Sequence, residues 1–509
     1  MRNIILRRVI IIIIALSLVL SVVFFAGGCG LNINRAGRDL NTYNMQLEFN
    51  AIDNIVSGKM QVDFKNKTEK ALENLHFNLY PSAFRDGAEQ KVVSEVNYEK
   101  CYYNGKSYGG IEILDCYENK NAGLEFSING EDENILIVNL KQPVEPENTI
   151  RVCVDFIVTI PNANHRFGYG ENTVNLGNFF PILCVYENGD WQDMFYYING
   201  DPFYSQTSNF NVEITYPASF VLATTGEEVS TKANPPAPNA NFITSTLKAR
   251  AVRDFAIVLS EKFEVLENKV KGITVKYYHY GDTKADETLE ACVNAMETYN
   301  KHFGEYPYKE IKIVMANFVH GGMEYPNLVM VADNIENYET YIYCIAHELA
   351  HQWWYGVVGN NQTEFAWLDE GLTEFSTAFF FEKNPQYGLS MEDLTERANS
   401  SYEVFQAVYG NVLNNINTAI NRPIYDFATE PEYFYMAYVK GFLLFQTLSE
   451  MIGEKMMLKC LQNYYQDFAF KIATPDGIIG SFEKTSKSAL EGFFNSFLNG
   501  KIITFSAEH

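Results

Sequence analysis

The sequence contains few cysteines, and they do not fall into pairs. There are eight in 509 residues, and the seven that follow Cys29 show neither a CxxC pair nor zinc-finger spacing. An odd number of widely spaced cysteines excludes a disulfide framework of the kind that holds small secreted domains together. The fold must therefore rest on a hydrophobic core.

Basic residues are also scarce. Lys and Arg number 39 against 63 Asp and Glu, which gives a formal net charge of -24. A chain of this charge repels phosphate backbones and anionic membrane surfaces. Nucleic acid is therefore excluded as a partner, and we interpret the acidity as that of a soluble, self-repelling surface.

Neither the composition nor the length fits a disordered or single-core chain. Hydrophobic residues make up 47%, aromatic residues 15% and charged residues 20%, which is typical of globular proteins. A length of 509 residues exceeds the size at which one hydrophobic core keeps growing. We therefore expect two or more folded domains.

The N-terminus has the pattern of an export signal. Three arginines lie within the first eight residues and precede an apolar run over residues 9–25. The small residues Ala26-Gly27-Gly28 then precede Cys29, and this arrangement resembles the cleavage site of bacterial lipoproteins. We expect a signal peptide over residues 1–28, a lipidated Cys29 as membrane anchor, and a spacer that extends to residue 40.

The apolar run is longer than most signal peptides and short for a spanning helix, so an uncleaved helical anchor remains the alternative. Either anchor places the rest of the chain on the extracytoplasmic face of the bacterial cell membrane.

Residues 41–265 are dominated by segments of strand period. Apolar residues alternate with mostly polar ones over residues 60–64, 150–160 and 210–216, as in half-buried strands. Turn signals such as Asn129-Gly130 separate these segments. This half is predicted to be an antiparallel β-sandwich or saddle domain.

Residues 266–509 change in character and are mostly helical. Helices are expected over residues 287–303, 338–355, 365–381, 435–452 and 454–468, and strands over 311–318 and 327–332. The expected helix from Tyr338 contains no Gly or Pro before Gly356, which should end it. The chain as a whole is therefore predicted to be a multidomain α+β protein.

One predicted helix carries the motif His347-Glu348-Leu349-Ala350-His351. Four residues along a helix turn two side chains to within about 40° of each other, so both imidazoles can bind one metal ion. Glu348 lies beside the first ligand, where its carboxylate can act as a base towards water instead of binding the metal.

A third ligand follows in Trp367-Leu368-Asp369-Glu370-Gly371. Glu370 comes after His351 with 18 residues between them, and two His with one Glu make a catalytic zinc site that keeps a fourth position open. The pattern resembles the aminopeptidase N family of thermolysin-like zinc peptidases (peptidase family M1). This resemblance implies one Zn²⁺ per chain and a thermolysin-like catalytic domain over residues 266–509.

Two further segments resemble the same family. Gly321, Gly322, Met323 and Glu324 match its substrate-binding GxMEN strand, whose glutamate binds the free α-amine, although Tyr325 stands where many members have Asn. Tyr438 matches its catalytic tyrosine, which implies a hydrogen bond to the oxyanion formed during hydrolysis. For Glu374, one helical turn after Glu370, the sequence leaves a ligand-orienting role and a solvated surface acid equally open.

The resemblance, which is to the smaller bacterial members, implies a zinc aminopeptidase that hydrolyses N-terminal residues from peptides with free N-termini. Three alternatives remain from the same residues: a zinc endopeptidase, a hydrolase of non-peptide substrates, and a catalytically silent peptide-binding protein. Glu324 argues against the endopeptidase, because an enzyme that cuts within a chain gains nothing from a group that binds the amine, and the intact ligands with Glu348 and Tyr438 argue against the silent protein.

Overall fold

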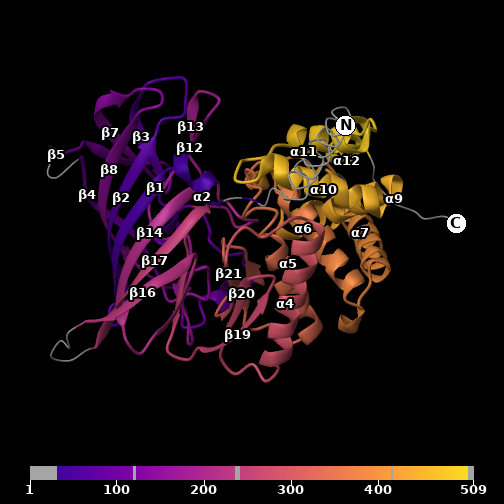
Figure 1. Cartoon of the computed structure of the whole chain (residues 1–509), viewed down its shortest axis with the longest axis horizontal. Helices are drawn as coiled ribbons and strands as arrows, with labels where there is room; N and C mark the ends of the chain where they lie inside the picture. The colour runs from indigo at the N-terminus through magenta and orange to yellow at the C-terminus, as the bar shows by residue number, and fades with distance from the viewer. Residues whose placement is uncertain (1–30, 32, 119–121, 235–240, 414–416, 502–509) are drawn as a thin grey trace, which may run out of the picture. The chain divides into compact units, whose positions relative to one another are not determined.

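The computed structural model describes residue 31 and residues 33–118, 122–234, 241–413 and 417–501 (Figure 1). Cys29 and the predicted signal peptide over residues 1–28 lie outside the described residues, so the lipid anchor stays a prediction. Within the described ranges, no helix is both long enough and apolar enough to cross a membrane.

The first half of the chain is built on an eight-stranded sheet in the order β16-β17-β14-β1-β2-β8-β4-β5. Its strands are β1 (Thr42–Asn50), β2 (Ile55–Lys65), β4 (Gly110–Glu118), β5 (Ala122–Gly123), β8 (Thr149–Thr159), β14 (Ser208–Pro217), β16 (Glu227–Ala233) and β17 (Phe242–Val252). All neighbours pair antiparallel except β1 with β14, which are parallel. The period-2 pattern that predicted strands over 60–64, 150–160 and 210–216 corresponds to β2, β8 and β14.

Two four-stranded sheets and a hairpin complete this half. One sheet contains β9 (Phe167–Tyr169), β10 (Val174–Leu176), β15 (Val221–Thr224) and β18 (Ile257–Ser260); the other contains β3 (Leu72–Asn78), β6 (Phe126–Asn129), β7 (Ile135–Val144) and β11 (Ile182–Leu183); the hairpin is β12 (Val185–Glu187) with β13 (Asp190–Gln192). Aromatic rings fill the space beneath the large sheet, where Tyr43 stacks on Phe210 at 4.7 Å. The prediction of an N-terminal β-domain is confirmed: this half is a multi-sheet β-domain, antiparallel apart from the β1–β14 pair.

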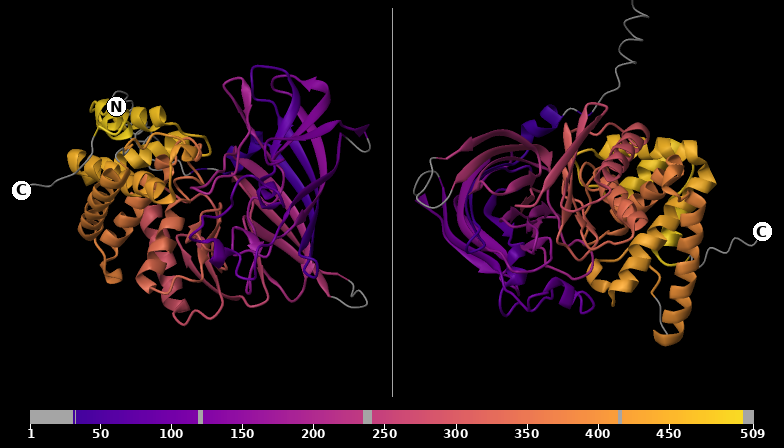
Figure 2. Two further views of the ribbon diagram at one scale, coloured as in Figure 1. Left: turned by 180° about the vertical axis from the view of Figure 1, so that it is seen from behind. Right: turned by 90° about the horizontal axis from the view of Figure 1, so that it is seen from below.

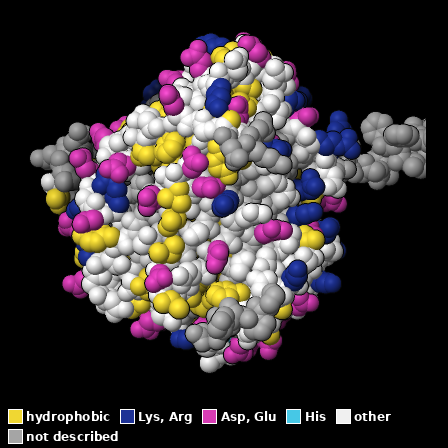
Figure 3. All heavy atoms as spheres, turned by 90° about the vertical axis from the view of Figure 1, so that its left-hand side faces the viewer, with side chains coloured by type: hydrophobic (Ala, Val, Ile, Leu, Met, Phe, Trp, Pro, Cys, Tyr) yellow, Lys and Arg dark blue, Asp and Glu magenta, His cyan; other side chains and the backbone are white. Residues whose placement is uncertain are grey.

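The surface of this half mixes side chains of all kinds. Figure 3 shows acidic and basic side chains interspersed over the face that it presents, with apolar side chains in small groups. The described residues of this face therefore form no continuous basic patch.

A five-stranded mixed sheet starts the second half, in the order β19-β20-β21-β23-β22. Its strands are β19 (Glu264–Val270), β20 (Ile273–His279), β21 (Glu310–Ala316), β22 (Gly322–Met323) and β23 (Leu328–Ala332). The short edge strand β22 runs antiparallel to β23, and it carries the GxMEN-like segment. The predicted boundary between residues 265 and 266 falls inside β19 and stays a prediction.

Helices form the rest of the second half, coloured from rose through orange to yellow in Figures 1 and 2. They are α4 (Ala285–His302), α5 (Tyr338–Ala350), α6 (Trp367–Lys383), α7 (Met391–Leu413), α8 (Glu430–Phe434), the π-helix η5 (Tyr435–Lys440), α9 (Gly441–Ile452), α10 (Glu454–Phe468), α11 (Pro475–Ser486) and α12 (Glu491–Leu498), besides the short α2 (Ile33–Ala36) and α3 (Tyr98–Cys101) near the start of the chain. Short 3₁₀ turns lie at η1 (Gly37–Asp39), η2 (Tyr80–Phe84), η3 (Pro385–Tyr387) and η4 (Ile424–Asp426).

The helix that carries the HExxH motif is shorter than predicted. α5 ends at Ala350, although the absence of Gly and Pro had predicted a helix as far as Tyr355. After His351 the chain continues in irregular turns, in which Gly356 N donates to the His351 carbonyl at 2.9 Å and the Trp354 carbonyl lies 3.0 Å from His351 Nδ1. A continuing helix would point this carbonyl along its axis and away from the imidazole. The α-helix therefore changes to irregular turns at the second histidine, and sequence propensity did not indicate this end.

Candidate active site

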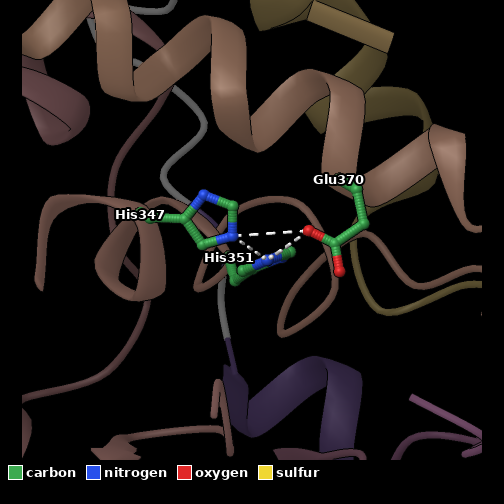
Figure 4. Close-up of side chains that lie close together, drawn as sticks. All are labelled: His347, His351 and Glu370. Carbon is green, nitrogen blue, oxygen red and sulfur yellow. Dashed lines mark hydrogen bonds and ion pairs between the residues drawn. The ribbon is translucent and has the colours of Figure 1, made fainter. Parts of the chain in front are cut away.

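His347 of α5 and His351, the residue that directly follows this helix, point to the same place. His347 Nε2 and His351 Nε2 are 3.1 Å apart, and both side chains are buried. Figure 4 shows the two imidazoles converging from α5 towards the carboxylate of Glu370. The four-residue spacing therefore brings the two imidazoles together at one point, as predicted from the sequence.

Glu370 lies in the first turn of α6 and completes a group of three. Its Oε2 atom is 3.3 Å from each of the two Nε2 atoms, and among the described residues that oxygen accepts no hydrogen bond of good geometry. A buried carboxylate oxygen without a donor is unfavourable, and a cation between the three atoms would satisfy it. Two His and one Glu with an open fourth position are the donor set of catalytic zinc, so the residues fit this metal.

The pKa values of these groups follow from burial and mutual attraction. Burial alone would lower the pKa of His351, but the Glu370 and Glu324 carboxylates raise it to about 10. Burial would raise the pKa of Glu370, but the two imidazoles lower it to about 2. The site thus favours positive charge between its three ligand atoms, and a divalent cation supplies that charge in place of protons.

Further residues orient the two imidazoles from behind. Thr373 Oγ1 lies 3.1 Å from His351 Nδ1, and Glu374 Oε1 lies 2.8 Å from His347 Nδ1. Glu374 also accepts a hydrogen bond from the Tyr343 hydroxyl. A carboxylate behind a ligating histidine fixes its tautomer and ring orientation. The geometry is therefore that of the ligand-orienting alternative for Glu374, between which and a surface acid the sequence could not decide.

Glu348 lies against the edge strand β22. It is buried, and burial raises its pKa to about 8. A Cβ atom at Gly322 would lie 2.1 Å from Glu348 Oε1, so only glycine leaves room for this carboxylate beside the strand. The close approach of the Glu348 carboxylate thus explains why residue 322 is a glycine.

Tyr438 reaches the site from the π-helix η5. Its hydroxyl donates to Glu370 Oε1 at 2.7 Å, and its ring stacks on that of His347 with centroids 5.8 Å apart. Two glycines allow α6 and the start of α9 to lie this close together, because a Cβ added to Gly371 of α6 would lie 2.9 Å from the backbone of Gly441 of α9. π-Helical turns occur frequently at functional sites, and this one replaces the uninterrupted helix predicted over 435–452.

Glu324 follows β22 and lies beside the metal-ligand group. One of its carboxylate oxygens is within 4.8 Å of ligand atoms of His351 and Asp369. Glu324 is 3% exposed, and burial raises its pKa to about 7. Gln352, which adjoins His351, donates to the carbonyls of Glu324 at 3.4 Å and Tyr325 at 3.2 Å. The structure thus places the predicted amine-binding carboxylate next to the predicted metal site.

Tyr325 connects this segment to the β-domain, a contact that the sequence did not reveal. Its buried hydroxyl donates to Asn178 Oδ1 at 2.6 Å, and Asn178 Nδ2 in turn donates to Asp254. A Cβ at Gly177 would lie 1.9 Å from the Tyr325 hydroxyl. The tyrosine that departs from the GxMEN pattern therefore has space beside Gly177 and a hydrogen-bond acceptor in Asn178, both in the other half of the chain.

Another unpredicted pair lies nearby. Arg166 and Asp201 of the β-domain form a largely buried ion pair, and Asp201 contributes to the raised pKa of Glu324. An Arg and an Asp that are 35 residues apart in a strand-rich segment gave no sequence signal. Their pairing could be found only from the folded chain.

Comparisons with known proteins agree with this geometry. Residues 287–497 match the model of the peptidase family M1 domain. Membrane alanyl aminopeptidase of Heliothis virescens is 24% identical over 147 residues, which cover 29% of this chain and 14% of that protein. Leukotriene A-4 hydrolase of Xenopus laevis is 26% identical over 259 residues, which cover 48% of this chain and 38% of that protein. The chain spans less than two fifths of the length of these relatives.

Solved structures extend the likeness over both halves of the chain. The M1 zinc metallopeptidase from Deinococcus radiodurans superposes with a TM-score of 0.65 at 14% identity, and the match covers 92% of this chain and 96% of that one. The chain thus has the fold of this two-domain zinc metallopeptidase, a β-domain followed by a helical domain, and the helical domain carries the His-His-Glu group. More particularly, residues 287–497 match the peptidase family M1 domain, in agreement with the resemblance seen in the motifs.

Proposed function

We propose that the protein is a zinc-dependent aminopeptidase that hydrolyses N-terminal residues from peptides. The observation that carries the proposal is the position of Glu324, a buried carboxylate within 4.8 Å of the His351 ligand atom. A carboxylate there pairs with the cationic end of a peptide and leaves room for about one residue before the scissile bond. An endopeptidase has no use for such a group.

Each site residue then has one task. Zinc, when bound by His347, His351 and Glu370, polarises the scissile carbonyl and lowers the pKa of water. Glu348 takes the proton of the attacking water and later delivers it to the leaving amine.

Tyr438 donates a hydrogen bond to the developing oxyanion. Burial raises the pKa of this phenol well above its ordinary value, so it keeps its proton at neutral pH. Glu324 fixes the α-ammonium, and Gly321, Gly322 and Met323 support the peptide as an edge strand.

The test is hydrolysis of matched peptides that carry free or acetylated N-termini, by the protein starting after residue 29, with and without a chelator. Stepwise loss of residues from the free peptides alone, abolished by the chelator and restored by zinc, is the expected result. Internal cuts in both peptides would indicate an endopeptidase.

Two other outcomes would also overturn the proposal. Zinc binding without peptide hydrolysis would indicate a silent peptide-binding protein or a hydrolase of another substrate. The second of these has support from the name of the leukotriene A-4 hydrolase relative. Epoxide and ester substrates, assayed on the same zinc-loaded protein, separate the two.

We also propose that Cys29 carries a lipid that holds the enzyme on the extracytoplasmic face of the cell membrane. The residues Ala26-Gly27-Gly28-Cys29 support this assignment. Metabolic labelling with a fatty acid in a bacterial host should mark the wild-type chain and not the Cys29→Ser variant. Equal labelling of both chains, or of neither, would contradict it.

A further inference from the structure

Gln362 lies in the loop between α5 and α6 and has no role in the motifs read from the sequence. Its side chain is 2% exposed. Gln362 Nε2 donates to Glu324 Oε1 at 2.7 Å and to Asp369 Oδ2 at 2.8 Å. One amide nitrogen thus joins the amine-binding carboxylate to the residue that precedes the metal ligand Glu370.

The orientation of this amide is determined by its neighbours. Asp369 is held in place because Asn360 Nδ2 donates to its other oxygen at 2.8 Å. Turning the Gln362 amide over would place its oxygen against two carboxylate oxygens, which repel it, whereas the NH₂ group has two hydrogens to donate. Nε2 is therefore the atom that contacts Glu324 and Asp369, and Oε1 contacts neither carboxylate.

Gln362 Oε1 is the unusual atom of this arrangement. It is buried, and it has no hydrogen-bond partner among the described residues. A buried amide oxygen without a donor is unfavourable, so a structure that keeps one usually uses it for a ligand or a water molecule.

A donor that suits both Oε1 and Glu324 is a primary ammonium group. The oxygen and nitrogen of one amide are about 2.3 Å apart, so Oε1 lies within roughly 5 Å of the Glu324 oxygen that Nε2 contacts. Two acceptors at such a separation can both accept hydrogen bonds from one nitrogen. An ammonium has three hydrogens and no acceptor, which fits a carboxylate beside a free amide oxygen.

We propose that Gln362 is a substrate-binding residue, whose Oε1 accepts a hydrogen bond from the free α-ammonium while its Nε2 holds Glu324 in position. This inference rests on the proposed aminopeptidase function and names a second group for the same amine. It makes recognition of the N-terminus depend on a neutral acceptor as well as on charge.

The experiment measures binding by calorimetry to the zinc-loaded protein carrying Glu348→Gln, which prevents turnover. The ligands are the tripeptide Ala-Phe-Ala and propionyl-Phe-Ala, which differ only in the α-ammonium. The variant Gln362→Met keeps the length of the side chain and removes both hydrogen-bonding groups. Gln446→Met is the matched control, because Gln446 donates to Glu450 on the exposed face of α9 at 3.0 Å.

Gln362→Met is expected to weaken binding of Ala-Phe-Ala about tenfold, which is the size of a hydrogen bond to a charged group. Binding of propionyl-Phe-Ala should stay within about twofold, and the control should change neither. Equal losses for both ligands would show that Gln362 is merely structural, and unchanged binding of both would show that it has no role. Either result would overturn the inference.

Hydrolysis of Ala-Phe-Ala by the wild-type protein distinguishes failure of this inference from failure of the proposed function. If the wild-type protein releases no N-terminal residues from Ala-Phe-Ala, the proposed function fails. If it does so, and Gln362→Met shows the same kcat and KM, only the role of Gln362 fails.

Discussion

The metal side and the amine side of the site are built in different ways. The three candidate ligands come from two helices and lie within residues 347–370, and their imidazoles are oriented by Thr373 and Glu374 on α6. Glu324, by contrast, is held by Gln362 and lies next to Tyr325, whose hydroxyl donates to Asn178 across 147 residues of chain. The metal side is therefore local to the second half, while the amine side depends on how the two halves pack.

This difference separates metal binding from substrate recognition. Changes behind the imidazoles should alter zinc affinity, and changes at the contact with the β-domain should alter the affinity for free N-termini. A single substitution that altered both affinities would contradict this separation.

The largest effect is expected for Glu348→Gln, which removes the base and leaves the metal ligands in place. General-base catalysis contributes on the order of 10²- to 10⁴-fold, so kcat should fall by about 10³ while the zinc content stays at one per chain. The measurement is steady-state hydrolysis of Ala-Phe-Ala together with elemental analysis. Retention of more than about a tenth of the activity would exclude Glu348 as the base.

A smaller effect is expected at the carboxylate behind His347. Glu374→Gln removes the charge that lies 2.8 Å from His347 Nδ1, and loss of such a partner weakens metal binding by about 10- to 100-fold. Zinc affinity is measured by competition with a chelator of known affinity. The control is Glu339→Gln on α5, whose carboxylate is about half exposed and pairs with Arg397, and it should leave zinc affinity unchanged.

If both variants bound zinc as tightly as the wild type, Glu374 would be an ordinary acid of the cavity beside it. That cavity, of about 330 Å³, is lined by Tyr343, Glu374 and Phe434 among others.

Tyr325→Phe tests whether the contact with the β-domain affects the amine side of the site alone. The substitution leaves Asn178 Oδ1 buried without its donor, which should lower the free energy of unfolding by about 1–3 kcal/mol. KM for Ala-Phe-Ala should rise several-fold because Glu324 adjoins Tyr325, while zinc affinity should not change. Tyr186→Phe is the control, because that hydroxyl donates to the Gly189 carbonyl in an exposed hairpin. A fall in zinc affinity in Tyr325→Phe would show that the two sides are not separate.

The same contrast explains what the sequence could predict. Local periodicity was sufficient for α10, whose observed bounds Glu454–Phe468 are those predicted, and for the alternation in β8. The His347–His351 spacing determines a shared face of one helix, so the metal-ligand geometry also follows from local structure. The early end of α5 did not follow, because no Gly or Pro marks the start of the irregular turns after His351.

The remaining site residues are invisible in the sequence for a related reason. Gln362 and Asn178 belong to no spaced pattern, and they meet Glu324 and Tyr325 only across 38 and 147 residues of chain. A Gln or an Asn in a loop usually lies on the protein surface. Only the packing of strands and helices shows that these two are buried and paired with the amine-binding segment.

The most direct test of the account is anomalous X-ray diffraction from crystals of the zinc-loaded Glu348→Gln variant with Ala-Phe-Ala. The account predicts one zinc peak at about 2.0–2.2 Å from His347 Nε2, His351 Nε2 and Glu370, with the peptide ammonium in contact with Glu324. A zinc ion bound elsewhere, or a peptide whose N-terminus points away from Glu324, would contradict it.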